Sequence, residues 1–213
     1  MKKLIAIMAL ALLAVTAAHA GNELDGAIVQ LQHDWAKANY HTARDQQEAA
    51  FKALADRAHQ ISATSSDKAE AMIWEAIVQS GYAKAKGGIG ALKHAEQARD
   101  LLRASLKLNP QALQGSAYTS LGSLYYKVPR WPLGFGDKKK AREYLEKALQ
   151  VNPDGIDPNY FYADFLLEQG ETAKAIEYFN KALNAPARPG REDADAGRRA
   201  DIEEGLQKAK QRS

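Results

Sequence analysis

The sequence pattern of one amphipathic helix occurs twice in the second half of this chain, and this duplication restricts the fold more than any other sequence feature. The segments KKKAREYLEKALQVNP and TAKAIEYFNKALNAP share their pattern of alanines and large apolar residues. Ala141 and Ala175 lie 34 residues apart, and the same interval separates Leu145 from Phe179. Such a period is typical of a repeat architecture, in which each unit buries its apolar face only against its neighbours.

A third copy and a set of partner helices extend the pattern. The segment AEQARDLLRASLKLNP places its alanine, leucine and final proline at the spacings of the other copies. Upstream of the later copies, LGSLY at 121–125 matches YADFL at 162–166. Small residues such as Gly122 and Ala163 let the two helices of one unit approach closely. Each unit is therefore expected to be a pair of antiparallel helices.

Helical spacing of apolar residues recurs along almost the whole chain, and strict strand-like alternation is nearly absent. Breakers such as Asn109-Pro110, Asn152-Pro153 and Gly170 separate the helical segments. We therefore predict an all-α fold of about nine helices. Their expected ranges are 23–39, 43–63, 67–86, 89–108, 111–127, 138–151, 157–169, 171–185 and 193–210.

These helix pairs resemble the tetratricopeptide repeat (TPR), a helix-turn-helix unit with a bulky-small pair in its first helix and regularly spaced alanines in its second. The resemblance implies an α-solenoid of antiparallel hairpins. Repeats are expected at about 67–110, 111–153 and 155–186. A further helix pair within 23–63 is a weaker match to the repeat. The polar segment 193–210 is expected to cap the array, because terminal repeats need a polar outer face.

The first twenty residues have the pattern of a secretory signal. Lys2 and Lys3 precede an apolar run from Leu4 to Val15, and Ala18-His19-Ala20 forms a cleavage site. We expect cleavage after Ala20 and export to the periplasm, leaving residues 21–213 as one TPR-like domain. The apolar run is shorter than a membrane span requires, and no cysteine follows it to carry a lipid anchor.

Composition excludes several classes of function. The 29 basic and 26 acidic side chains nearly balance, so no strongly basic face for nucleic acid is indicated. The chain has no cysteine, which excludes thiol catalysis and thiolate metal sites. The segment KGGIGALK at 86–93 lacks the ending of a phosphate loop, and SSDK at 65–68 has the pattern of a helix start. We expect no enzymatic activity, no metal and no cofactor.

The candidate binding residues follow from the resemblance, because TPR arrays usually bind protein partners in a concave groove lined by the first helix of each pair. Tyrosines there would supply a large contact area with a polar tip. For Tyr160, packing between helices is an equally good interpretation. The residues expected on the groove are Thr119, Ser123, Tyr126 and Lys127 from one repeat, and Tyr160, Asp164, Leu167 and Glu168 from the next.

The loop at 128–137, VPRWPLGFGD, interrupts the helical pattern. Its prolines push the preceding residues out of the helical region, and Asp137 can cap the helix that follows. Trp131 and Phe135 either pack against neighbouring helices or present an apolar surface to a partner. We favour packing, and Phe135 inside with Trp131 partly outside is a third arrangement.

A cluster of arginines lies near the C-terminus. An anionic ligand could use these side chains, but ion pairing with neighbouring acidic residues is the interpretation that we favour. The arginines are Arg188, Arg191, Arg198 and Arg199, and the acidic neighbours are Glu192, Asp193 and Asp195.

The loop leading into GFGDKKKA also gives the chain a similarity to the periplasmic TPR subunits associated with TRAP transporters. That similarity implies docking of a solute-binding protein, or carriage of a small hydrophobic ligand, and assembly around a pore. The missing lipid-anchor cysteine departs from the group and weakens the implied assembly. The sequence as a whole predicts an exported, non-catalytic TPR scaffold for protein–protein interaction, with a TRAP-type accessory subunit as the alternative.

Overall fold

The computed structural model describes residues 23–212, and within this range the chain is all-α. The expected signal peptide and its cleavage after Ala20 lie outside the described residues. No described helix is long and apolar enough to cross a membrane.

The helices follow the predicted order closely. Residues 23–36 are helical and continue into a π-helical turn, η1. The second helix begins later than predicted, because a turn occupies residues 42–46. The named elements are η1 (Lys37–His41), α2 (Gln47–Thr64), α3 (Ala69–Lys86), α4 (Gly88–Leu108), α5 (Ala112–Lys127), α6 (Lys138–Val151), α7 (Ile156–Glu168), α8 (Thr172–Leu183) and α9 (Glu192–Lys210).

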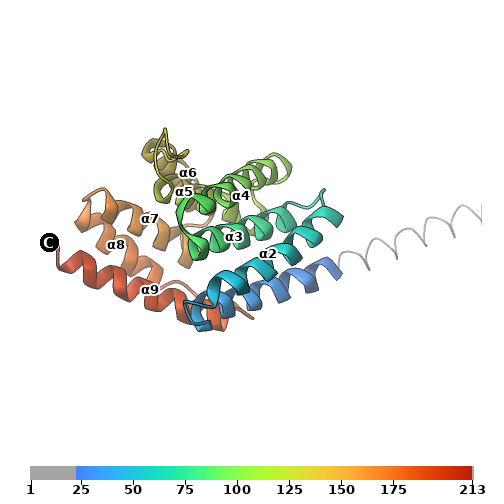
Figure 1. The fold of residues 1–213 in the computed structure, drawn as a ribbon. Helices are drawn as coiled ribbons and strands as arrows, with labels where there is room; N and C mark the ends of the chain where they lie inside the picture. Colours follow the sequence, from blue (N-terminus) through green and yellow to red (C-terminus); the bar gives the residue numbers. More distant parts are fainter. Residues whose placement is uncertain (1–22, 213) are drawn as a thin grey trace, which may run out of the picture.

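The predicted α-solenoid is confirmed. Helices α3 and α4, α5 and α6, and α7 and α8 pack as successive hairpins (Figure 1). Helix α2 packs against α3 at one end of the array, and α9 packs against α8 at the other. Helix α9 also contacts η1, at the end of the first helical segment (Figure 1).

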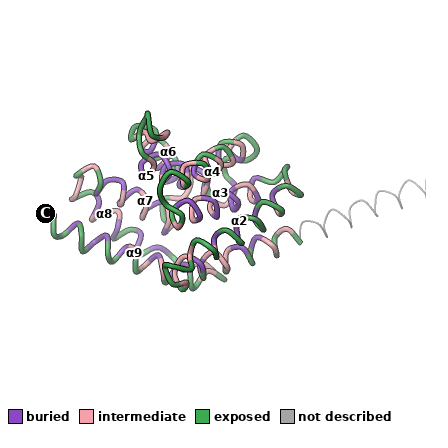
Figure 2. Tube along the Cα trace, viewed as in Figure 1, coloured by how far each residue is buried: buried purple, intermediate pink, exposed green. Residues whose placement is uncertain are grey.

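Small residues allow the helices of each hairpin to approach closely, as the sequence pattern predicts. A Cβ atom on Gly122 of α5 would lie only 2.5 Å from Cγ of Leu145 on α6. Leu102, Leu145 and Phe179, which hold the same repeat position, are fully buried. The buried bands in Figure 2 run along the faces where helices meet. The core is therefore a continuous seam between helices.

The starts of two helices differ in how they are capped. Asp137 caps α6, since its Oδ1 accepts hydrogen bonds from the backbone N–H groups of Lys139 and Lys140 at 3.0 and 3.1 Å. This cap was predicted from the sequence. Helix α3 instead starts after Lys68 with no side-chain cap, so the start that SSDK predicted is displaced.

The loop at 128–137 has its two aromatic side chains in different environments. Phe135 is half-buried, with its ring edge-on to Tyr125 at 5.6 Å between centroids and beneath the guanidinium of Arg99 at 4.6 Å. Trp131 is 86% exposed and precedes a cis Pro132. The packing that we favoured for Trp131 is therefore wrong, because the folded-back loop leaves its ring no helix to contact. The mixed arrangement is the one adopted.

Substituting Gly122 by alanine tests the close approach of α5 and α6. The added methyl overlaps Leu145, and we expect a loss of about 1–3 kcal/mol in the free energy of unfolding. Gly26 is the matched control, because a Cβ there meets nothing within 4 Å. Gly26→Ala should be neutral or stabilising by up to about 1 kcal/mol. Urea unfolding measures both, and equal effects would contradict the packing argument.

Trp131→Ala tests the exposure of the loop. Because the ring is in solvent, the change in the free energy of unfolding should stay within about 0.5 kcal/mol. A thermal melt beside the wild type measures the change. A loss of about 3–5 kcal/mol, as for a core aromatic, would show that the ring packs inside.

Candidate ligand-binding groove

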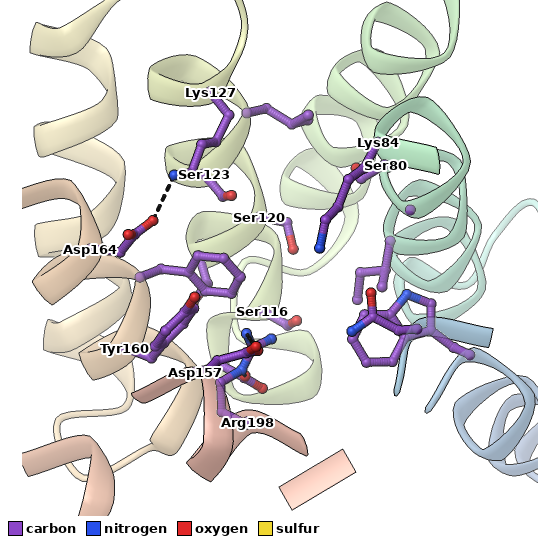
Figure 3. A pocket seen from close by; sticks show the side chains of 18 of the residues that line it. Ser80, Lys84, Ser116, Ser120, Ser123, Lys127, Asp157, Tyr160, Asp164 and Arg198 are labelled. Atoms are coloured by element: carbon purple, nitrogen blue, oxygen red, sulfur yellow. Dashed lines mark hydrogen bonds and ion pairs between the residues drawn. The ribbon is translucent and has the colours of Figure 1, made fainter. Parts of the chain in front are cut away.

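A groove of about 1910 Å³ opens on the side of the array formed by α3, α5 and α7. Residues between Gln32 and Tyr40 extend its wall next to α3, and the segment from Pro186 into α9 borders it next to α7. Figure 3 shows α5 in the middle, with labelled side chains converging from α3 on one side and from α7 and α9 on the other. The first helix of each hairpin thus faces this space.

Hydroxyl groups line the α5 wall. Ser116, Ser120 and Ser123 are spaced so that they share one face of the helix, and all three border the groove (Figure 3). Lys84 points into the same space from α3, and no described carboxylate lies within ion-pair distance of it. This wall can donate and accept hydrogen bonds along about two helical turns.

The start of α5 departs from the predicted helix. Leu113, Gln114 and Gly115 have φ angles of 48°, 55° and 74°, in the left-handed region, and regular helix follows from Ser116. Left-handed backbone is unfavourable for residues other than glycine. At Gly115 a side chain is also excluded by Val151, because a Cβ would lie 2.8 Å from it. The turn places Leu113 and Gln114 on the groove wall.

Lys127 and Asp164 join the α5 and α7 walls. Lys127 Nζ lies 2.8 Å from Asp164 Oδ2 and also pairs with Glu168 (Figure 3). Burial alone would lower the pKa of Lys127, but the two carboxylates outweigh it and the pKa is raised. Tyr126 donates its hydroxyl hydrogen to Asp164 at 2.8 Å. Burial, followed by the charge of Asp164, raises the pKa of Tyr126 well above its usual value.

Asp157 of α7 is the centre of a second ionic cluster. Its carboxylate accepts hydrogen bonds from Arg188 at 2.6 Å and from Arg198 at 2.8 Å. Burial alone would raise the pKa of Asp157, but the two guanidinium groups hold it well below the usual value. Arg198 also pairs with Asp201 at 3.0 Å. The guanidinium of Arg198 lies over the ring of Tyr160 at 4.4 Å.

The arginine cluster is only partly as predicted. Arg188 does pair with Asp195, at 2.6 Å, but Glu192 and Asp193 form no ion pair among the described residues. Asp157, which lies 31 residues before Arg188 in sequence, holds the cluster instead. Local charge pattern could not reveal this partner, because the contact depends on how α9 packs against α7. Arg199 binds the backbone carbonyls of Leu183 and Ala185. Arg191 forms no ion pair among the described residues.

The structure distributes the predicted binding residues between the groove and the core. Tyr126 and Leu167 are buried between helices, so the prediction that they face the groove is wrong for both. Phe135 is held under Arg99 and Trp131 lies outside the groove lining, so neither contributes to it. Tyr160 both borders the groove and packs against Phe179. The predicted residues that line the groove are Thr119, Ser123, Lys127, Tyr160 and Asp164.

Several groove residues escaped the sequence analysis. Ser116 and Ser120 lie three helix positions before predicted ones, and their spacing would have revealed them. Nothing in the sequence indicated that Trp35 and Trp74 border the groove, because aromatic residues on an amphipathic helix are usually assigned to the core. Within the described residues, no group of His, Asp and Glu side chains is arranged to hold a metal ion.

Comparison with known proteins identifies the repeat. Residues 133–190 match the family model described as tetratricopeptide repeat. The chain has a TPR fold. A thermophilic TPR protein of Thermus thermophilus, TTC0263, superimposes with a TM-score of 0.57 at 15% identity, covering 90% of this chain and 95% of that one. The Pseudomonas aeruginosa protein pilF aligns with a TM-score of 0.36 at 18% identity, over 90% of this chain and 89% of its own. No curated protein matches the sequence.

Asp157→Asn tests the second ionic cluster. The substitution leaves Arg188 and Arg198 without their shared carboxylate, and we expect a loss of about 2–4 kcal/mol in the free energy of unfolding, somewhat less than for a fully buried pair. Asp154→Asn, at an exposed position of the same groove, should change it by less than about 0.5 kcal/mol. Urea unfolding at neutral pH measures both, and equal losses would contradict the assignment.

The same variants have a predicted pH dependence. The folded-state pKa of Asp157 lies below its unfolded value of about 3.9, so ionised Asp157 stabilises the fold above about pH 4. This contribution is lost as the pH falls through the folded-state pKa. The stability difference between wild type and Asp157→Asn should therefore shrink on acidification. A difference that stays constant between neutral pH and about pH 2 would contradict this account.

Proposed function

We propose that this protein is an exported, non-catalytic scaffold that binds a protein partner through the groove between α3, α5 and α7. The TPR fold generally mediates protein–protein interaction, and the groove lies where the first helices of the repeats face one another. The observation that carries the proposal is the mixed lining: serine hydroxyls, Lys84 and Tyr160 alternate with apolar side chains along one continuous surface. Such a surface can bind backbone amides and side chains of a peptide segment together.

The groove has two chemically different ends. Around the α3–α4 turn and the 128–137 loop its lining includes the apolar side chains of Leu92, Val128 and Leu133, next to Lys84 and the Lys127–Asp164 ion pair. Next to α9 its lining carries Asp157, Arg191 and Arg198. A segment lying along α5 would therefore meet apolar side chains beside one ion pair at one end, and the arginine–aspartate cluster at the other. This asymmetry would select the direction in which a partner segment binds.

A groove-blocking variant tests the proposal. Ser120→Trp places an indole in the middle of the α5 wall, whereas Gln150→Trp adds the same group at an exposed position of α6 that does not border the groove. Tagged mature protein captures partners from a periplasmic extract, and mass spectrometry identifies them. We expect a specific partner with the wild type and with Gln150→Trp, and at least about tenfold less of it with Ser120→Trp.

Two outcomes of this capture would contradict the proposal. A partner retained equally by all three proteins would place the interaction outside the groove. An extract that yields no specific partner would argue against a scaffold role. Circular dichroism and thermal melts of the variants establish beforehand that each is folded.

The similarity to TRAP-associated subunits supplies a second candidate function, accessory to solute transport. The apolar end of the groove favours it, because Leu92, Val128 and Leu133 could receive a small hydrophobic ligand. This candidate predicts that the captured partner is a solute-binding protein, and that Leu133→Lys weakens its capture. Capture of an unrelated protein would instead support the general scaffold.

A further inference from the structure

Three large apolar side chains extend into solvent from two turns of the array. Ile89, in the first turn of α4, is 97% exposed, and Trp131 and Leu133, in the loop between α5 and α6, are 86% and 75% exposed. The other exposed large apolar side chains among the described residues are Val29 and Leu108, at 49% and 50%. Exposed apolar groups that gather in one place mark a binding surface, whereas scattered ones need no explanation.

The fold brings these two turns together. A Cβ atom on Gly134 in the loop would lie 3.3 Å from Cδ1 of Leu92 in α4. Phe135 fixes the loop against the same helix, because its ring lies under the guanidinium of Arg99. In Figure 1 the loop between α5 and α6 projects from the array, and Figure 2 shows it as exposed. We call residues 84–93 and 128–140 the two-turn surface.

Positive charge is concentrated on the two-turn surface. It carries seven basic side chains and one acidic one, although the whole chain nearly balances, with 29 basic and 26 acidic residues. The acidic residue, Asp137, caps α6 and lies 3.9 Å from Lys140. Four basic side chains lie outside the groove lining, are exposed and form no ion pair among the described residues: Lys93, Arg130, Lys138 and Lys139.

Protruding apolar side chains among unpaired cations fit an anionic lipid surface. Tryptophan prefers the interface between headgroups and acyl chains, and aliphatic side chains can enter the same layer. Lysine and arginine beside them are attracted to anionic headgroups. Protein–protein interfaces are instead depleted in lysine. The combination on the two-turn surface therefore favours a membrane over a protein as the occupant.

We propose that the two-turn surface binds the surface of an anionic phospholipid membrane. Ile89, Trp131 and Leu133 would enter the headgroup region, and the basic side chains would contact the lipid phosphates. Ile89 and Leu133 also border the groove, so one end of the groove would lie beside the membrane. The inference does not rest on the proposed function, because it requires no ligand or partner in the groove.

Vesicle binding provides a direct test. Mature protein, residues 21–213, is mixed with vesicles of phosphatidylcholine alone or with about one third phosphatidylglycerol. Sedimentation should show binding at least about tenfold tighter to the anionic vesicles, and about 0.5 M salt should reduce this preference.

Tryptophan fluorescence reports whether the loop enters the lipid. On vesicle binding the emission of Trp131 should shift to shorter wavelength, because its exposed ring leaves water. Trp35 and Trp74 belong to the core packing beside α2 and should keep their environment. Trp131→Phe should remove the shift while keeping most of the binding, because phenylalanine is also apolar and aromatic.

Matched variants test the apolar contribution. The double substitution of Ile89→Ser and Trp131→Ser should weaken binding to the anionic vesicles at least about tenfold. Leu108→Ser with Val29→Ser removes two exposed apolar side chains elsewhere and should change binding less than about threefold. Thermal melts establish that both proteins are folded.

A second pair of variants tests the charge. Each basic side chain near an anionic surface strengthens binding about fivefold, so Lys138→Gln with Lys139→Gln should weaken it at least about tenfold. Lys107→Gln with Lys147→Gln removes the same net charge near the opposite ends of α4 and α6, at exposed positions. This control should change binding less than about threefold.

The controls and the groove variant separate the possible results. Equal binding to neutral and anionic vesicles, no binding up to about 5 mM lipid, or equal losses in the variants and their controls would overturn the proposal. Self-association or partner capture that depends on Trp131, without vesicle binding, would identify a second copy or a protein as the occupant and would also overturn it. Vesicle binding that Ser120→Trp leaves intact, with no captured partner, would support the lipid surface and reject the scaffold. Partner capture that Ser120→Trp abolishes, without vesicle binding by the wild type, would reject the lipid surface and keep the scaffold.

Discussion

The contact between α9 and the N-terminal part of the array is the interaction on which the groove depends. The ring of Tyr40 in η1 lies against Gly197, where an added Cβ would come 2.4 Å from it. The hydroxyl of Tyr40 donates to Asp201 at 3.1 Å, and Asp201 in turn pairs with Arg198. Without this contact the stacked hairpins would leave a surface open on one side. With it, the first and last helical segments border a common space (Figure 1).

Ionic contacts connect the closing helix to the repeats. Arg198 bridges Asp201 on its own helix and Asp157 on α7, and its guanidinium also covers Tyr160. Lys127 and Asp164 similarly join α5 to α7. These pairs lie at the edge of the groove, where partial burial strengthens them relative to exposed surface pairs. These ion pairs help to fix the positions of α5, α7 and α9 relative to one another. Hydrophobic packing is less directional and would define these positions less specifically.

The carboxylates on the groove walls accept hydrogen bonds from neighbouring side chains, whereas some buried donors of the groove residues have no acceptor among the described residues. The carboxylates of Asp157 and Asp164 each accept two or more hydrogen bonds. The donors of Trp35, Trp74 and Arg191 have no acceptor among the described residues. Unpaired buried polar atoms are not confined to this wall, since Gln169 Nε2 and Asn159 Oδ1, which do not border the groove, also have no partner among the described residues.

The sequence correctly predicted those groove residues whose position follows from the regular spacing of side chains along a helix. Thr119, Ser123 and Lys127 were expected on the groove from the register that the TPR resemblance implies, and they do line it, since residues three and four apart share a helix face. The same reasoning failed for Tyr126 and Leu167, since a face defined by spacing extends around the helix and its margins become buried when the next hairpin packs. For Trp131, exposure depends on the path of a loop, which no periodic pattern describes.

The sequence by itself determined the all-α class, the hairpin repeat and most helix bounds, because those properties follow from local spacing of small and apolar residues and from the breakers between them. Only the tertiary structure decided that Asp157 would hold Arg188 and Arg198, and that Arg191 would lie over Trp74. The Asp157 pairs join α7 to the neighbouring C-terminal segment, and the contact of Arg191 with Trp74 joins that segment to α3 at the other end of the array. Their geometry depends on the accumulated rotation between hairpins, which is the sum of many small packing differences and is not encoded by any single segment.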